Sequence, residues 1–178
     1  MEYLILFLPL IASIISGFFG KFLGDKICQV LTSAFVSVSS ILSLVIFFKV
    51  INDSYSNNLI IAKWINSGSL DVNWSINIDA LSSVMLVVVT LISSLVHIYS
   101  IGYMSHDPHK PRFMSYLSLF TFAMLTLVTS DNFIQLFFGW EGVGLCSYFL
   151  IGFWYKKKSA NAAAIKAFLV NRVGDFGF

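Results

Sequence analysis

The sequence predicts an all-α fold, a polytopic transmembrane bundle of about six helices. Of its 178 residues, 57% are hydrophobic and only 11% are charged, and the mean hydropathy is +0.83. Soluble domains carry about 25% charged residues, so this composition is typical of a membrane protein. The apolar residues also fall into segments of roughly 20, the length that crosses a hydrocarbon core of about 30 Å.

Six segments account for the predicted helices, and residues 1–178 are interpreted as one amino-terminal transmembrane unit. Four segments are long and apolar throughout: residues 3–23, 27–51, 79–104 and 112–130. A fifth covers residues 131–155, and a sixth begins near Ser159 and runs to residue 178, so that the chain is expected to be truncated within this helix. Residues 52–78 are rich in Asn and Ser and are predicted to form a loop.

Two other interpretations of the apolar segments are disfavoured. A cleaved signal peptide needs a positive start and a small-residue cleavage site, whereas the first segment begins with Glu2 and a long apolar run. Strands of a membrane β-barrel would give short segments of alternating polarity, and none is identified. Both observations favour spanning helices.

Basic residues divide unevenly between the two sets of connections. The first set carries seven: Lys21, Lys26, Lys110, Arg112, Lys156, Lys157 and Lys158. The second set carries only Lys49 and Lys63. Because Lys and Arg concentrate in cytoplasmic loops, the first set is predicted to face the cytoplasm. The amino terminus and residues 52–78 would then lie outside.

Away from the helix ends, charged residues within predicted spans occur only in the last two helices. They are Glu141, Lys166, Arg172 and Asp175. Such charges cost about 2.5–3.5 kcal/mol each at the centre of a spanning helix and usually face a bundle interior or a wet cavity. Glu141 lies ten residues after Asp131, which places it about 15 Å deep by helix rise. Burial favours its neutral acid and a nearby cation favours its carboxylate, so Glu141 is predicted to load and release a proton.

The sixth helix supplies the cations. At about 100° per residue, Arg172 and Asp175 lie within about 60° and are expected to pair, whereas Lys166 lies opposite Asp175. Antiparallel packing would bring Glu141 level with Arg172 and Asp175, with Lys166 on the cytoplasmic approach. Two structural alternatives stay open: the pair only neutralises itself, or Lys166 extends its amine to the interface.

Other chemistry finds little support in the sequence. Cys28 and Cys146 are far apart and are interpreted as small packed residues. His97 is favoured as a hydrogen-bonded structural residue over a proton relay, and "GWEGVG" is favoured as a close-packing helix over a phosphate loop. No metal, haem, flavin or iron–sulfur motif is identified. The net charge of +2 argues against nucleic-acid binding.

Several stretches resemble subunit L of respiratory complex I, the NADH:quinone oxidoreductase, also known as the mitochondrial chain 5 type. The resemblance is carried by "GWEGVGLCSYFLIGFWY" and "AAAIKAFLVNRVGDFGF", and by "INIDALSSVMLVVVT", "HIYSIGYM" and "RFMSYLSLF" in matching order. It covers residues 76–178 clearly. The family consists of antiporter-like proton-pumping subunits that are several times longer, so the resemblance implies an amino-terminal fragment.

The resemblance also implies roles for individual residues. Glu141 corresponds to the essential fifth-helix glutamate, Asp175 to the sixth-helix aspartate, and Lys166 and Arg172 to basic positions of that helix. The implied function is proton translocation coupled to electron transfer from NADH to quinone, with no redox centre in this chain. A subunit of a multisubunit Na+/H+ antiporter or membrane hydrogenase, or an inactive gene remnant, is the alternative.

The resemblance implies partners and a location as well. NADH, FMN, iron–sulfur clusters and quinone would be bound elsewhere in the whole complex. The expected partners are the other membrane-arm subunits of complex I and the lipid bilayer. The expected location is the inner (plasma) membrane of a bacterium, as a multi-pass protein, or alternatively the mitochondrial inner membrane.

Overall fold

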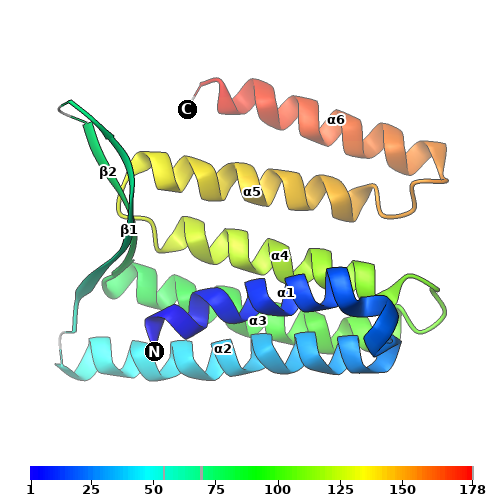
Figure 1. Ribbon diagram of the computed structural model, residues 1–178, viewed down its shortest axis with the longest axis horizontal. Helices are drawn as coiled ribbons and strands as arrows, with labels where there is room; N and C mark the ends of the chain where they lie inside the picture. The colour runs from blue at the N-terminus through cyan, green and yellow to red at the C-terminus, as the bar shows by residue number, and fades with distance from the viewer. Residues whose placement is uncertain (54, 69, 178) are drawn as a thin grey trace.

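The computed structural model describes residues 1–53, 55–68 and 70–177, and these form six helices and one β-hairpin. The elements are α1 Glu2–Leu23, α2 Asp25–Asp53, β1 Asn57–Ser67, β2 Leu70–Ile78, α3 Ala80–Tyr103, α4 Lys110–Val128, α5 Phe133–Ile151 and α6 Lys158–Asp175. The helices run alongside one another, with α5 and α6 stacked beyond α4 on one side of the bundle (Figure 1). The predicted helical membrane bundle is confirmed.

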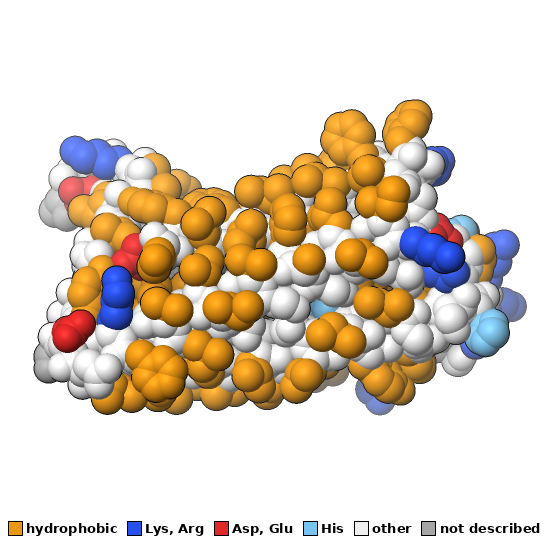
Figure 2. Space-filling view, turned by 90° about the horizontal axis from the view of Figure 1, so that it is seen from below, with side chains coloured by type: hydrophobic (Ala, Val, Ile, Leu, Met, Phe, Trp, Pro, Cys, Tyr) orange, Lys and Arg blue, Asp and Glu red, His pale blue; other side chains and the backbone are white. Residues whose placement is uncertain are grey.

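Five of the helices, α1 to α5, are long and apolar enough to cross a membrane by length and composition. Helix α6 is not in this set for the described residues, because its 18 residues include Lys158, Lys166, Arg172 and Asp175. Apolar side chains cover the length of the bundle in Figure 2, and charged side chains gather towards its two ends. This distribution fits a body surrounded by lipid with its ends in water.

Side-chain caps fix where two of the helices begin. Asp79 precedes α3, and its carboxylate accepts a hydrogen bond of 2.6 Å from the Ser82 N–H while the Ser82 hydroxyl accepts one from the Asp79 N–H. This reciprocal arrangement satisfies backbone donors that a helix start leaves unpaired. Asn132 caps α5 by accepting a hydrogen bond of 2.8 Å from the Gln135 N–H. The pKa of Asp79 is lowered because backbone N–H groups, first that of Ser82, stabilise its carboxylate.

Residues 52–78 are predicted to form a loop, whereas the structure has the antiparallel hairpin β1–β2 there. A signal for it exists in the sequence. From Asp71 to Ile78 polar and apolar residues alternate strictly, and the apolar set includes Val72, Ile76 and Ile78, all at most 5% exposed. The conclusion that no alternating segment occurs is therefore wrong for this stretch. The alternation is easily missed because its polar residues include Asn and Ser, which are also common in loops.

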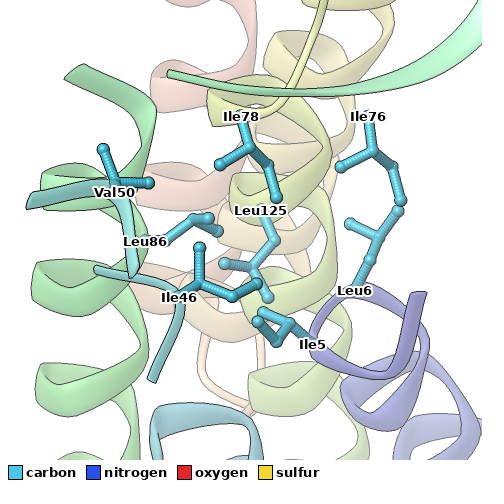
Figure 3. Close-up of a cluster of buried hydrophobic side chains, with 8 residues drawn as sticks. All are labelled: Ile5, Leu6, Ile46, Val50, Ile76, Ile78, Leu86 and Leu125. Carbon is cyan, nitrogen blue, oxygen red and sulfur yellow. The ribbon is translucent and has the colours of Figure 1, made fainter. Parts of the chain in front are cut away.

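A cluster of buried apolar side chains lies beneath β2 at the hairpin end of the bundle (Figure 3). Its members are Ile5, Leu6, Ile46, Val50, Ile76, Ile78, Leu86 and Leu125. They come from α1, α2, β2, α3 and α4, so the hairpin is anchored to four helices through a shared core. Away from the hairpin, many contacts between these helices are polar but neutral.

Hydroxyl groups connect α2, α3 and α4 along their length. Ser43 contacts Thr90 at 2.7 Å and Ser37 contacts Ser94 at 2.8 Å, each between α2 and α3. Ser93 of α3 also contacts Thr121 of α4. Small hydroxyl side chains allow helices to approach closely and still hydrogen-bond in an apolar environment. The described residues of α2 to α4 thus pack closely through groups that carry no charge.

Candidate functional site

Glu141 of α5 forms an ion pair with Arg172 of α6, its Oε1 accepting a hydrogen bond from Arg172 Nη1. Glu141 is the ninth of the 19 residues of α5, so the pair lies near the middle of a helix that can span the membrane. The Glu141 side chain is 18% exposed, against 49% for Arg172. Glu141 thus lies level with Arg172, and the acid is the more enclosed partner of the pair.

An ion pair between Arg172 and Asp175 within α6 is predicted from the sequence. Among the described residues, Arg172 pairs with Glu141 instead. Arg172 reaches across to Glu141, and its guanidinium lies 5.0 Å from the centre of the Phe168 ring. The Asp175 carboxylate instead accepts a hydrogen bond of 2.8 Å from Trp140 Nε1. The physical reason is competition: Glu141 needs the cation that antiparallel packing brings to it, whereas Asp175 has an indole N–H beside it. Trp140 is not singled out by the sequence.

Lys166 is exposed and lies six residues before Arg172, about 9 Å nearer the start of α6 by helix rise. It takes part in none of the ion pairs between described residues, which include the Glu141–Arg172 pair. It lies nearer than Arg172 to the Lys156–Lys158 end of the helix pair. A role for it in proton transfer stays a prediction.

Two glycines bring α5 against α4. A Cβ atom on Gly139 would stand 2.7 Å from the backbone N and Cα of Leu127, and one on Gly142 would stand 3.1 Å from the Ala123 Cβ. Gly144 differs, since a Cβ there would meet nothing within 4 Å among the described residues. Close packing, the favoured interpretation of this motif, thus applies to Gly139 and Gly142. Contact through these glycines fixes the rotation of α5 and turns Glu141 towards α6.

A groove of about 700 Å³ opens between α4, α5 and α6. Its polar lining consists of Trp140, Ser147, Asn171 and Asp175, and the remainder is apolar or glycine. Gly144 also lines it, which explains why that glycine has open space around it. Neither member of the ion pair lines the groove, but Trp140 and Asn171, which do, directly precede Glu141 and Arg172 in the chain. The hydroxyl, amide and carboxylate groups of the lining can hold water.

The hairpin contacts the first turns of α5, on the N-terminal side of Glu141. The Gln135 side chain is fully buried; its Oε1 accepts a 3.0 Å hydrogen bond from the Ser75 N–H, and its Nε2 donates one of 2.7 Å to the Ser75 carbonyl. Asn132 Nδ2 donates to the Asn73 carbonyl at 2.9 Å. Phe138 packs edge-on against the rings of Trp64 and Trp74. Sequence reasoning misses these contacts because it misses the hairpin itself.

His97 behaves as the favoured structural interpretation requires. It is fully buried, its Nδ1 lies 2.7 Å from the Ser93 carbonyl and its Nε2 lies 3.0 Å from the Ser118 hydroxyl. Only a protonated Nδ1 can bond a carbonyl, so Nδ1 donates and Nε2 accepts from Ser118 in a neutral ring. Cys28 and Cys146 are buried free thiols, as expected. No group of three or more His, Cys, Asp or Glu gathers among the described residues.

Two family descriptions match parts of this chain. Residues 64–114 match the family described as NADH-Ubiquinone oxidoreductase (complex I), chain 5 N-terminus. Residues 130–178, which include the ion pair, match the family described as NADH:quinone oxidoreductase/Mrp antiporter, TM. The fold and site thus define a multi-pass membrane protein with an ion pair at mid-depth.

Individual relatives identify a particular family within this class of membrane proteins. NADH-ubiquinone oxidoreductase chain 5 of Arabidopsis thaliana is 60% identical over 177 residues, covering 99% of this chain and 26% of the relative. NADH-quinone oxidoreductase subunit L of Rickettsia conorii is 55% identical over 175 residues, covering 98% and 27%. The chain belongs to the complex I chain 5/subunit L family. It spans about a quarter of the length of these relatives.

A solved structure shares the fold. The archaeal membrane-bound sulfane sulfur reductase complex contains a chain that matches 98% of this one with a TM-score of 0.79, at 17% sequence identity. The match covers 34% of that chain. At this identity the likeness concerns the helical arrangement alone.

Proposed function

We propose that this chain is the amino-terminal part of a proton-translocating membrane subunit of an NADH:quinone oxidoreductase, in which Glu141 is the proton carrier. The observation that supports this most directly is the Glu141–Arg172 ion pair at the middle of α5. A charge at that depth is costly, and membrane proteins keep such charges where they move ions or protons. The names of the relatives support the enzyme class.

Arg172 acts in this proposal as the group that controls the charge of Glu141. While the guanidinium is in place, the carboxylate is stabilised and releases its proton. When Arg172 turns away, the enclosed carboxyl no longer has a cation and takes up a proton at Oε1. Half of the Arg172 side chain is exposed, so it has room for such a movement. Asp175 and Trp140 hold the neighbouring turn of α6 against α5.

In this proposal the groove between α4, α5 and α6 provides the path by which protons reach or leave Glu141. Ser147, Asn171 and Asp175 line it and can support a short row of water molecules that delivers or removes the proton. Lys166 lies on the same helix nearer its start and serves as the next site on the route. The electron transfer that drives the cycle takes place on NADH, FMN, iron–sulfur clusters and quinone in other subunits, and further membrane-arm subunits are the partners of this chain.

The test uses the full-length subunit within the assembled complex in its membrane. Glu141→Gln keeps the shape and can still accept a hydrogen bond from Arg172, but it cannot titrate. We expect normal assembly and a strong loss of protons pumped per NADH oxidised, with partial activity in Glu141→Asp. The matched control is Asp131→Asn, an exposed carboxylate that accepts a hydrogen bond from Asn58 at one end of the bundle.

Two outcomes would contradict the proposal. Wild-type pumping by Glu141→Gln in normally assembled complex would make the glutamate a packing residue. A mutant that pumps protons normally but loses sodium movement would favour an Na+/H+ antiporter role, in line with the antiporters that the description of the second matched family names. Measuring both ions in the same vesicles separates the two.

A further inference from the structure

A second groove, of about 620 Å³, lies between the end of α1 and the start of α4, and it shares no lining residue with the groove between α4, α5 and α6. Lys21, His109 and Arg112 line it together with Asp25. It belongs to the end of the bundle that carries seven of the Lys and Arg residues. The proposed proton path does not use it.

The carboxylates around this groove do not balance all of its cations. Asp25 is already paired with Lys110 at 3.7 Å. Arg112 forms none of the ion pairs between described residues: its Nη2 donates a 3.0 Å hydrogen bond to the Phe153 carbonyl. Asp107, another acid of this end, accepts hydrogen bonds from Trp154 Nε1 and from the His109 N–H. Asp107 also interacts electrostatically with Arg112. With Asp25 paired to Lys110 and Asp107 compensating part of the charge of Arg112, Lys21 leaves this end of the groove with a net positive charge.

Arg112 is also held in a fixed orientation. Its guanidinium carbon lies 4.6 Å from the centre of the Phe153 ring and 5.3 Å from that of Tyr155. Phe153 and Tyr155 line a separate groove together with Arg112, so Arg112 borders both grooves. The planar N–H groups of a guanidinium suit the oxygens of a phosphate. Little side-chain entropy is then lost when an anion binds.

The floor and sides of the groove have the character of a lipid site. Close contact of α1 with α4 forms the floor, since Cβ atoms on Gly17 and Gly20 would stand 2.8 and 2.7 Å from Ser115 and Pro111. On the flank of α1, Phe18 is 78% and Ile14 45% exposed, and they lie about one and two turns from Lys21 towards the middle of the helix. A charged end at the membrane surface thus continues into an apolar wall.

From this arrangement we infer that the groove binds an anionic phospholipid, with its phosphate between Lys21 and Arg112 and one acyl chain along Ile14 and Phe18. Basic pockets between membrane helices bind acidic headgroups, and each Lys or Arg contributes enough to change binding about fivefold. A free phosphate would use the basic end alone. A phospholipid without net charge would use the apolar wall alone.

The test is photo-labelling of the purified complex that contains the full-length subunit. A photoreactive phosphatidylglycerol is added in detergent, and the labelled peptides are identified by mass spectrometry. We expect labelling at the α1–α4 groove that falls about fivefold in Lys21→Gln. Lys26→Gln is the matched control, because it removes the same charge from the same end of the bundle at a residue that does not line this groove.

Three further arms make the result decisive. A photoreactive phosphatidylcholine should label the groove weakly, and excess inorganic phosphate should not displace the anionic lipid. Equal labelling of the Lys21→Gln and Lys26→Gln proteins would overturn the inference in favour of general attraction to the basic end. Displacement by phosphate would overturn it in favour of a free-anion site, and absence of labelling in the wild-type complex would do so in favour of a protein segment that covers the groove. Labelling does not depend on pumping, so its outcome is independent of the role of Glu141.

Discussion

Helices α1 to α4 differ from helices α5 and α6 in the charge and the burial of their polar contacts. In the first region the described polar contacts at mid-depth are neutral and buried, as in the Ser43–Thr90 and His97–Ser118 contacts. In the second they are charged, and the ion pair stays partly open, with Arg172 49% exposed. Ala164 is the one described residue of α6 that is buried.

This difference indicates which polar groups hold a membrane bundle together and which can change their partner or their protonation. A hydroxyl that loses its neighbour can return to a carbonyl of its own helix, so its contacts cost little to make or break. A charge has no such local substitute and depends on its partner. The first region is therefore suited to a fixed scaffold, and the second to a change of partner or of protonation.

The largest expected effect is a loss of assembled complex when Glu141 is left without its cationic partner. Arg172→Met leaves Glu141 without its cation in an enclosed position, where an unpaired charge costs about 2.5–3.5 kcal/mol. We expect much less assembled complex, and recovery when Glu141→Gln is added. Lys166→Met is the control, because it removes the same charge from an exposed site on the same helix. The measurement is the amount of intact complex on native gels; a double variant as poor as the single one would refute the pairing.

The contact between the two regions is the next place to test. Gly139→Ala puts a Cβ atom 2.7 Å from the Leu127 backbone, so α5 must move away from α4 at a cost of about 1–3 kcal/mol. Gly144→Ala adds the same methyl group where nothing described lies within 4 Å. We expect a lower thermal unfolding temperature of the complex for Gly139→Ala only. Equal temperatures for the two variants would show that the glycine contact does not set the packing.

A charge at the membrane surface should behave differently from one inside. Asp79→Ala removes the cap of α3 and should cost about 1 kcal/mol at neutral pH, whereas Asp79→Asn keeps a capping oxygen. The folded pKa of Asp79 lies below its ordinary value of 3.8, so its contribution is complete above that value and is lost as the pH falls through the folded pKa. Thermal unfolding between neutral and acidic pH should show this dependence in the wild type and a smaller one in Asp79→Asn. The same pH dependence in both proteins would assign it to other carboxylates.

The smallest effect is expected within the hydroxyl network. Ser43→Ala removes the contact with Thr90, but the Thr90 hydroxyl keeps a 2.7 Å hydrogen bond to the Leu86 carbonyl. A contact of this kind is worth about 0.6 kcal/mol in a membrane. A double-mutant cycle with Thr90→Val on the full-length subunit measures it. A coupling as large as that of the ion pair would erase the distinction between the two regions.

Much of the fold can be predicted because hydropathy and length alone define spanning helices. The expected segment 79–104, for example, corresponds to α3 at Ala80–Tyr103. The hairpin escapes prediction because its alternation from Asp71 to Ile78 is short and its polar members resemble loop residues. Local sequence rules do not reveal that Gln135, in a helix, supplies the partners that Ser75 needs in a strand.

The candidate site can be predicted in its members but not in its pairing. Glu141 and Arg172 stand out because charges are rare within apolar helices. Which acid Arg172 binds depends on the rotation of α5 against α6, which is set by contacts such as Gly139 with Leu127. Those contacts join residues that are not neighbours in the chain, so spacing within α6 points to the nearer acid, Asp175.

The second strand of the hairpin has one further consequence, for association with other chains. The outer edge of a strand normally offers free N–H and C=O groups that invite a foreign strand and lead to aggregation. Along β2 these groups are already taken: the Asn73 carbonyl by Asn132, both groups of Ser75 by Gln135, and the Asn77 N–H by the Thr129 carbonyl. Any chain that extends this sheet must therefore add to β1.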